Sequence, residues 1–259
     1  MTELPAELRP PLVELLLSAA DDKFILGHRN ADWTGLAPIL EEDIAFSSLA
    51  QDDLAHAAAL YDFICGLTGD NANRLAYGRR PAEYRCAALV ELADEFDWAV
   101  AIARQFLCDH FEMLRLGRLA RSAYPPLAEL ARRMLAEERL SLGHADQWVI
   151  RLGRAADDAP ARMQAALDRL APLAVELFEP TAGMDALESA GVYPHDAPSM
   201  YDLWEASVRN IVQEAGLRID LRPPPPDFRG GRSGKRSPLF ADLLAELTEV
   251  YRVEPEAAW

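Results

Sequence analysis

The chain has 259 residues, of which 50% are hydrophobic and 26% are charged, and its formal net charge is −16 at pH 7. This composition is typical of a soluble globular protein that is long enough to bury a sizeable core. The acidic balance argues against nucleic acid as a partner, because contacts with phosphate need a positive surface.

The sequence shows no sign of export or of insertion into a membrane. The first residues contain only a short apolar run without a basic segment before it, so they do not resemble a signal peptide. No apolar run approaches the roughly 20 residues that cross a bilayer. Cys65, Cys86 and Cys108 lack the spacing of metal ligands, and an odd number argues against a disulfide scaffold. We therefore expect a cytoplasmic protein.

Apolar residues recur with a period close to 3.6 along most of the chain, which predicts an all-α fold. No segment shows the sustained alternation that is typical of a strand. Four long helices are expected before Gly153, and they indicate a ferritin-like up-and-down four-helix bundle. Their predicted ranges are 12–29, 39–67, 88–119 and 127–153, with a polar, irregular stretch at 72–86.

The remainder of the chain is expected to add shorter helices and an extended arm. Helices are predicted at 160–178, where Pro172 should kink the run, near 183–190, and after a cap at Ser199. Pro223 to Pro226 exclude a helix from 218–236, and Ser237-Pro238 opens the last helix. We expect a single domain over residues 1–259, with the core bundle at 11–153 and accessory helices and tail at 154–259.

Acidic residues recur at regular spacing within the four long helices. Two of them are followed, three residues later, by a second polar side chain. They are Asp22, Asp53 with His56, Asp109, and Glu138 with Ser141. A ferritin-like di-iron site needs one carboxylate and then a carboxylate-x-x-His pair, twice. Two neighbouring irons take bridging carboxylates and one imidazole each. The spacing therefore indicates the remains of a di-iron site.

The set is incomplete as a metal site. Ser141 stands where the second His is needed, and three of the four acids are Asp, which reaches one methylene less far than Glu. We predict that the chain has no catalytic residues, no cofactor and no metal of its own. The acids are then buried polar groups that pair with arginines such as Arg104, Arg115 or Arg139.

Several other stretches carry a resemblance to a known family, through their order and spacing along essentially the whole chain. They are GHRNADWTG at 27–35, ARQF at 103–106, WVIRLG at 148–153, and GGRSG at 230–234 before LLAELTEVYR and the terminal Trp259. With them, the sequence resembles the C subunits of bacterial ring-1,2-phenylacetyl-CoA epoxidases, which are multicomponent monooxygenases of phenylacetate catabolism.

The resemblance implies a ferritin-like, non-catalytic subunit that supports a catalytic A subunit. In that family the A subunit holds the di-iron centre and binds the aryl-CoA whose ring is epoxidised. The resemblance also implies a reductase subunit that uses NADPH, flavin and iron–sulfur clusters, together with small accessory subunits. A homodimer is an alternative for the chain in isolation.

Two other functions stay open from the residues alone. The chain is an oxygenase in its own right if its acids and imidazole bind two metals, the ligands being Asp22, Asp53, His56, Asp109 and Glu138. The other function is a ferritin-type storage bundle, although nothing in the sequence supplies a cage interface.

Two arginine-rich segments, Arg74–Arg85 and Arg229–Arg236, also have two interpretations. They contact a CoA phosphate or an acidic partner face, or they are solvated linkers. We favour solvated linkers for both.

Overall fold

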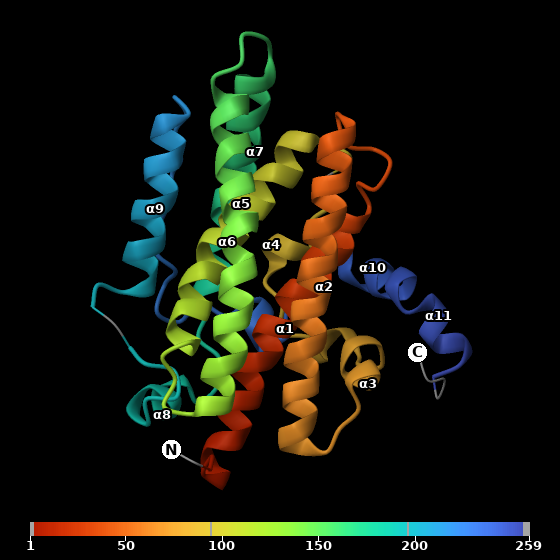
Figure 1. The fold of residues 1–259 in the computed structure, drawn as a ribbon, viewed down its shortest axis with the longest axis vertical. Helices are drawn as coiled ribbons and strands as arrows, with labels where there is room; N and C mark the ends of the chain where they lie inside the picture. Colours follow the sequence, from red (N-terminus) through yellow and green to blue (C-terminus); the bar gives the residue numbers. More distant parts are fainter. Residues whose placement is uncertain (1–2, 94, 196, 256–259) are drawn as a thin grey trace. The chain divides into compact units, whose positions relative to one another are not determined.

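The structure, a computed structural model, describes residues 3–93, 95–195 and 197–255. Within those ranges the regular secondary structure consists of eleven α-helices and four short 3₁₀ helices, without a strand (Figure 1). The all-α prediction is confirmed. None of the described helices is long and apolar enough to cross a membrane.

The chain forms two compact units, each named here after its pair of long helices. The described residues of the α1–α2 unit lie at 9–93, 179–182 and 227–255, and those of the α5–α6 unit lie at 3–8, 95–178 and 183–226. Each unit therefore supplies one pair of the long helices that the sequence predicts. The prediction of a single domain over residues 1–259 stays a prediction.

The α1–α2 unit is built on α1 (Arg9–Ala31), which packs along α2 (Leu40–Thr68). Most of α1 is buried, including the central Asp21, Asp22 and Lys23. Gly69 ends α2 in the left-handed conformation with φ 76°, which glycine adopts without steric cost. The other elements of this unit are α3 (Ala72–Tyr77), η2 (Pro81–Glu83), α4 (Ala88–Glu91), η4 (Gly231–Ser233), α10 (Phe240–Leu247) and α11 (Glu249–Val253).

The α5–α6 unit is built on α5 (Trp98–Leu119) and α6 (Pro125–Gly153), which pack together and against α7 (Ala159–Ala174) and α9 (Met200–Glu214). Trp204 of α9 is buried and donates its indole N–H to the Leu107 carbonyl at 3.1 Å. His110 of α5 forms hydrogen bonds with Asp146 of α6 at 2.9 Å and with Ser207 of α9 at 3.0 Å. The other elements are η1 (Ala6–Leu8), η3 (Val175–Phe178) and α8 (Met184–Ser189).

The predicted helix at 88–119 is wrong as a single element. Its first turn is α4, and the chain then leaves the helical conformation, with φ of 55° at Glu95 and 57° at Phe96. Asp97 starts α5 anew, because its side chain accepts a hydrogen bond from the Ala99 amide at 2.9 Å. This break is also where the chain passes from one unit to the other.

Other boundaries differ less from the prediction. The stretch at 72–86 contains α3, which Asn71 caps by accepting from the Arg74 amide at 3.0 Å. Pro172 lies inside α7, which ends at Ala174 and continues as η3. The cap at Ser199 is confirmed, and it forms a capping box with Asp202.

At the C-terminal end of the described chain, residues 218–236 contain no α-helix, as predicted, although η4 interrupts the arm. The last helices begin at Phe240, after Ser237-Pro238 rather than at them. Trp259 lies outside the described residues.

Candidate functional site

The first predicted ligand position, Asp22, carries a guanidinium on its carboxylate. The two side-chain nitrogens Nη1 and Nη2 of Arg232 donate to the two carboxylate oxygens, each at 2.7 Å. The Ala87 amide donates to the same carboxylate at 2.9 Å. Both side chains are buried, with exposed fractions of 7% for Asp22 and 2% for Arg232. This is a bidentate, charge-assisted pair, which is the strongest form of such an interaction.

The loop that brings Arg232 to Asp22 is held in the interior of the α1–α2 unit. The Arg232 amide donates to Glu179 at 2.9 Å, and its Nη1 also donates to the Arg85 carbonyl at 2.7 Å. A Cβ atom on Gly231 would lie 2.0 Å from the Cys86 carbonyl oxygen, so only glycine permits this approach.

Arg236, at the end of the same loop, pairs with the buried Glu91. The interpretation of Arg229–Arg236 as a solvated linker is therefore wrong at Arg232 and Arg236. Their charges face buried carboxylates instead of water.

The second position, Asp53 on α2, is buried and carries an ammonium. Lys23 of α1 donates to one carboxylate oxygen at 2.7 Å, and Asn30 donates to the other at 3.1 Å. The Lys23 side chain is 2% exposed. Because a buried ammonium needs a counter-charge, Lys23 and Asp53 depend on each other. His56 is also buried, one helical turn further along α2.

A third acid in this unit, Asp21, was missed by the sequence reasoning. It accepts hydrogen bonds from the Tyr61 hydroxyl at 2.6 Å, from the Arg85 amide at 2.6 Å, and from both terminal nitrogens of Arg79. The Arg79 guanidinium also lies 4.0 Å from the centroid of the Tyr84 ring. Burial, and next the charge of Asp21, raise the pKa of the Tyr61 hydroxyl well above its usual value. Arg79 is therefore not part of a solvated linker.

In the α5–α6 unit, the predicted positions Asp109, Glu138 and Ser141 are all buried. The Ser141 hydroxyl donates to Asp109 at 2.6 Å, and the Gln105 amide nitrogen donates to the other carboxylate oxygen at 2.6 Å. Gln105 and Ser141 are themselves hydrogen-bonded at 3.0 Å. Ser141 is thus a neutral donor to the buried Asp109.

The comparison with protein families covers the entire chain. The family model for the phenylacetic acid catabolic proteins matches residues 1–259. The chain belongs to this family. One relative is the C subunit of the 1,2-phenylacetyl-CoA epoxidase of Escherichia coli (strain K12). It is 30% identical over 250 residues, which are 96% of this chain and 99% of the relative. The resemblance seen in the sequence is confirmed.

The donor set of this chain does not fit a di-iron centre. Among the described residues, no three His, Cys, Asp or Glu side chains are grouped so that they could hold a metal ion. In the α1–α2 unit, Arg232 and Lys23 place positive charges on the carboxylates that a metal would need. Metal binding there would first require two buried ion pairs to break, which is costly.

For two of the acids, Asp22 and Asp53, the paired cations differ from the arginines that the sequence suggested. Arg115 pairs with Glu112, and Arg139 is exposed, whereas the cations on Asp22 and Asp53 are Arg232 and Lys23. One signal was available for Lys23, because it directly follows Asp21-Asp22 in the middle of an apolar helix. No local signal marked Arg232, which is 210 residues away from its partner.

Proposed function

We propose that this chain is a non-catalytic structural subunit of a multicomponent phenylacetyl-CoA epoxidase. In this role it supports a separate di-iron subunit, which epoxidises the aromatic ring in phenylacetate catabolism. Membership of the phenylacetic acid catabolic protein family and the full-length match to the C subunit of the epoxidase support the assignment. The observation that carries the non-catalytic role is the buried, bidentate pair of Arg232 and Asp22.

The chemistry of that pair favours a structural role. A guanidinium stays protonated at any physiological pH, so Arg232 holds a permanent positive charge against both oxygens of Asp22. An iron ion at the same carboxylate would be repelled by that charge in a buried, poorly screened setting. Lys23 has the same effect at Asp53. These acids therefore stabilise the α1–α2 unit instead of binding oxygen-activating metals.

The partners in this proposal are those that the resemblance to the epoxidase C subunits implies. The di-iron subunit binds the aryl-CoA, and a reductase subunit passes electrons from NADPH through flavin and iron–sulfur groups. Small accessory subunits complete the proposed complex, which works in the cytoplasm.

The proposal is tested by co-expressing the chain with the di-iron subunit from the same host and measuring iron in each separated subunit. We expect about two irons per chain in the partner and no stoichiometric iron in this chain. The complex with His56→Ala is expected to keep its epoxidation rate with phenylacetyl-CoA.

The alternative, an oxygenase that uses Asp22, Asp53, His56, Asp109 and Glu138, predicts the opposite results. It requires iron in this chain when it is expressed alone, and loss of activity with His56→Ala. Either result, obtained with a folded His56→Ala variant, would overturn the proposal.

A further inference from the structure

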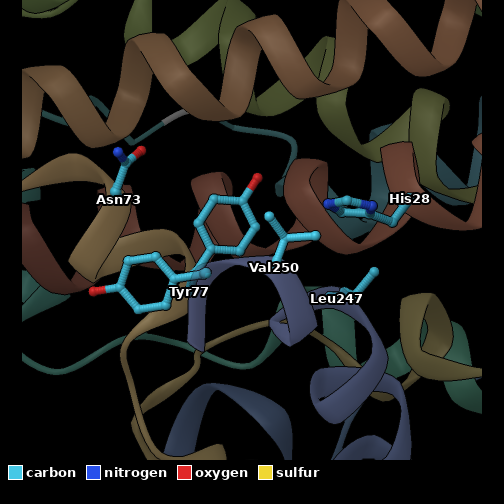
Figure 2. A pocket seen from close by; sticks show the side chains of 6 residues that line it. His28, Asn73, Tyr77, Leu247 and Val250 are labelled. Carbon is cyan, nitrogen blue, oxygen red and sulfur yellow. The ribbon is translucent and has the colours of Figure 1, made fainter. Parts of the chain in front are cut away.

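The α1–α2 unit contains a cavity of about 270 Å³ that the predicted acid positions do not line. Its walls come from three places in the sequence, namely α1, α3 and the α10–α11 segment (Figure 2). The lining side chains are His28, Asn73, Tyr77, Leu247, Val250 and Tyr251. For comparison, an apolar cavity of about 150 Å³ is large enough to admit benzene. This cavity therefore has room for one substituted ring.

Aromatic contacts hold the walls of this cavity in place. The rings of Tyr77 and Tyr251 stack with their centroids 5.8 Å apart and an interplanar angle of 28°. Phe24 contacts both His28 and Tyr77 edge to face, with centroid separations of 4.7 Å and 5.2 Å. Leu247 and Val250 add aliphatic surface. A flat apolar ring finds matching surface here, because aromatic groups pack well in offset and edge-to-face arrangements.

The described side chains that line the cavity offer no charged group to a ligand at neutral pH. It consists of an imidazole, a carboxamide, two phenols and two aliphatic side chains. Burial lowers the pKa of His28 to about 4 and raises the pKa of Tyr77, so both side chains are uncharged near pH 7. An ionised ligand would lose its hydration without gaining a counter-charge from these six lining side chains. The cavity therefore favours an uncharged ligand.

One polar atom at this cavity has no hydrogen-bond partner among the described residues. It is Nε2 of His28, and it is buried. Figure 2 shows the imidazole ring extending from α1 toward Val250. In a neutral imidazole one nitrogen donates and the other accepts. A hydroxyl group satisfies Nε2 in either tautomer, since it can donate as well as accept.

We propose that this cavity binds a small, uncharged, planar aromatic molecule that carries one hydroxyl or similar hydrogen-bonding group. The ring packs against Tyr77, Leu247 and Val250, and the polar group forms a hydrogen bond with His28 Nε2. This site is independent of the acid positions and of the proposed structural role, because its residues are separate from the buried ion pairs.

The probe for this site is phenol, titrated into the full-length chain and followed by NMR with labelled histidine. The chain has only five histidines, so the His28 signals can be assigned with His28→Phe. We expect saturable shifts of the His28 signals, with no change at the exposed His195. Toluene, which lacks the hydroxyl, is expected to bind about two- to tenfold more weakly, which corresponds to the loss of one hydrogen bond. Cyclohexanol, which is not planar, should also bind more weakly than phenol.

Two substitutions on α11 provide the matched comparison. Val250→Trp places a large ring at a position that lines the cavity, whereas Val253→Trp adds the same ring at a position that does not. Both valines are exposed, at 62% and 83%, so both variants are expected to fold. Val250→Trp should weaken phenol binding by tenfold or more, on the order of the loss of a packed apolar site, and Val253→Trp should leave it unchanged.

Removal of the imidazole separates the contribution of the hydrogen bond from that of the apolar packing. His28→Phe keeps the ring but removes Nε2, so it should reduce the affinity for phenol to about that for toluene. The inference is overturned if wild-type protein shows no saturable binding, or if Val250→Trp binds phenol like Val253→Trp. Because no iron or partner subunit enters the assay, its outcome is separate from that of the proposed function.

Discussion

At the scale of single residues, the buried charges of the α1–α2 unit act in pairs, so removal of one partner affects the other. Arg232→Gln leaves the Asp22 carboxylate buried without its guanidinium. We expect the variant to lose about 3–5 kcal/mol of unfolding free energy, measured by urea denaturation followed by circular dichroism. Arg222 pairs with Asp220 at the surface, with side chains 82% and 74% exposed, so Arg222→Gln should be close to neutral.

A second variant shows whether the effect belongs to the pair. Asp22→Asn combined with Arg232→Gln removes both charges, so it should be more stable than Arg232→Gln alone. If Arg232→Gln and Arg222→Gln unfold at the same urea concentration, the buried pair does not stabilise the fold more than the surface pair does.

His28 predicts a pH dependence of stability. Its pKa in the folded chain is about 4, below the ordinary value of 6.5, because burial disfavours the imidazolium. Unfolding therefore takes up a proton between these pH values. The contribution of His28 to stability is complete above pH 6.5 and decreases as the pH falls toward 4, by about 3 kcal/mol at most.

The measurement is the unfolding free energy from pH 7.5 to pH 4.5, compared with that of His28→Phe. The variant keeps the ring contact with Phe24 but has no titrating group, so its stability should depend less on pH. His195→Phe, at an exposed imidazole, serves as the control and should follow the wild type. If the unfolding free energies of wild type and His28→Phe change with pH in the same way, the lowered pKa of His28 is contradicted.

The same residues show how far sequence reasoning reaches at this scale. The spacing of Asp22, Asp53 and Asp109 identified positions that are all buried, because a helical period locates a side chain on a face. It did not identify Arg232, because a pairing over 210 residues depends on the tertiary fold. The glycines beside it are typical of a solvated loop, yet they permit close approach to buried backbone.

At the scale of secondary-structure elements, two glycines of α6 provide a matched test of packing. A Cβ on Gly153 would lie 2.5 Å from the Ala215 carbonyl oxygen, whereas a Cβ on Gly143 would meet no atom within 4 Å. Gly153→Ala should therefore destabilise the chain by about 1–3 kcal/mol. Gly143→Ala should stabilise it by up to about 1 kcal/mol, because alanine favours the helix.

Thermal and urea unfolding of the two variants measure the difference directly. If Gly153→Ala and Gly143→Ala change the unfolding free energy by the same amount, α6 and the segment after α9 do not approach as closely at Gly153 as the structure shows.

The break between α4 and α5 shows why element boundaries are harder to predict than element types. Leu92 and Phe96 continue the apolar period of the predicted helix, so the pattern gave no reason to divide it. Phe96 is instead 62% exposed with a φ of 57°. The only local signal was Asp97, because Asp is a common N-cap residue. An Asp alone does not show that a helix begins there, since Asp also occurs within helices. Helix 127–153 was predicted well, because Pro125 and Pro126 mark its start.

At the scale of the whole molecule, each unit holds part of the acid pattern together with hydrogen-bond donors for it. In the α1–α2 unit, the cations Lys23 and Arg232 pair with Asp53 and Asp22. In the α5–α6 unit, the neutral side chains of Gln105 and Ser141 donate to Asp109. In each of these contacts, both partners belong to the same unit. We therefore expect that one added ligand does not create a metal site, because Asp22, Asp53 and Asp109 keep these partners.

This independence predicts the result of restoring the missing imidazole. Ser141→His supplies the ligand type that the di-iron pattern lacks, but it leaves Arg232 on Asp22 and Lys23 on Asp53. We expect no stoichiometric iron in the purified variant after incubation with Fe²⁺ without oxygen, measured by elemental analysis. Ser141→Gln, a neutral side chain of intermediate size, controls for the added volume at this buried position, and circular dichroism establishes that both variants are folded. About two irons per chain in Ser141→His alone would show that the buried cations do not prevent metal binding.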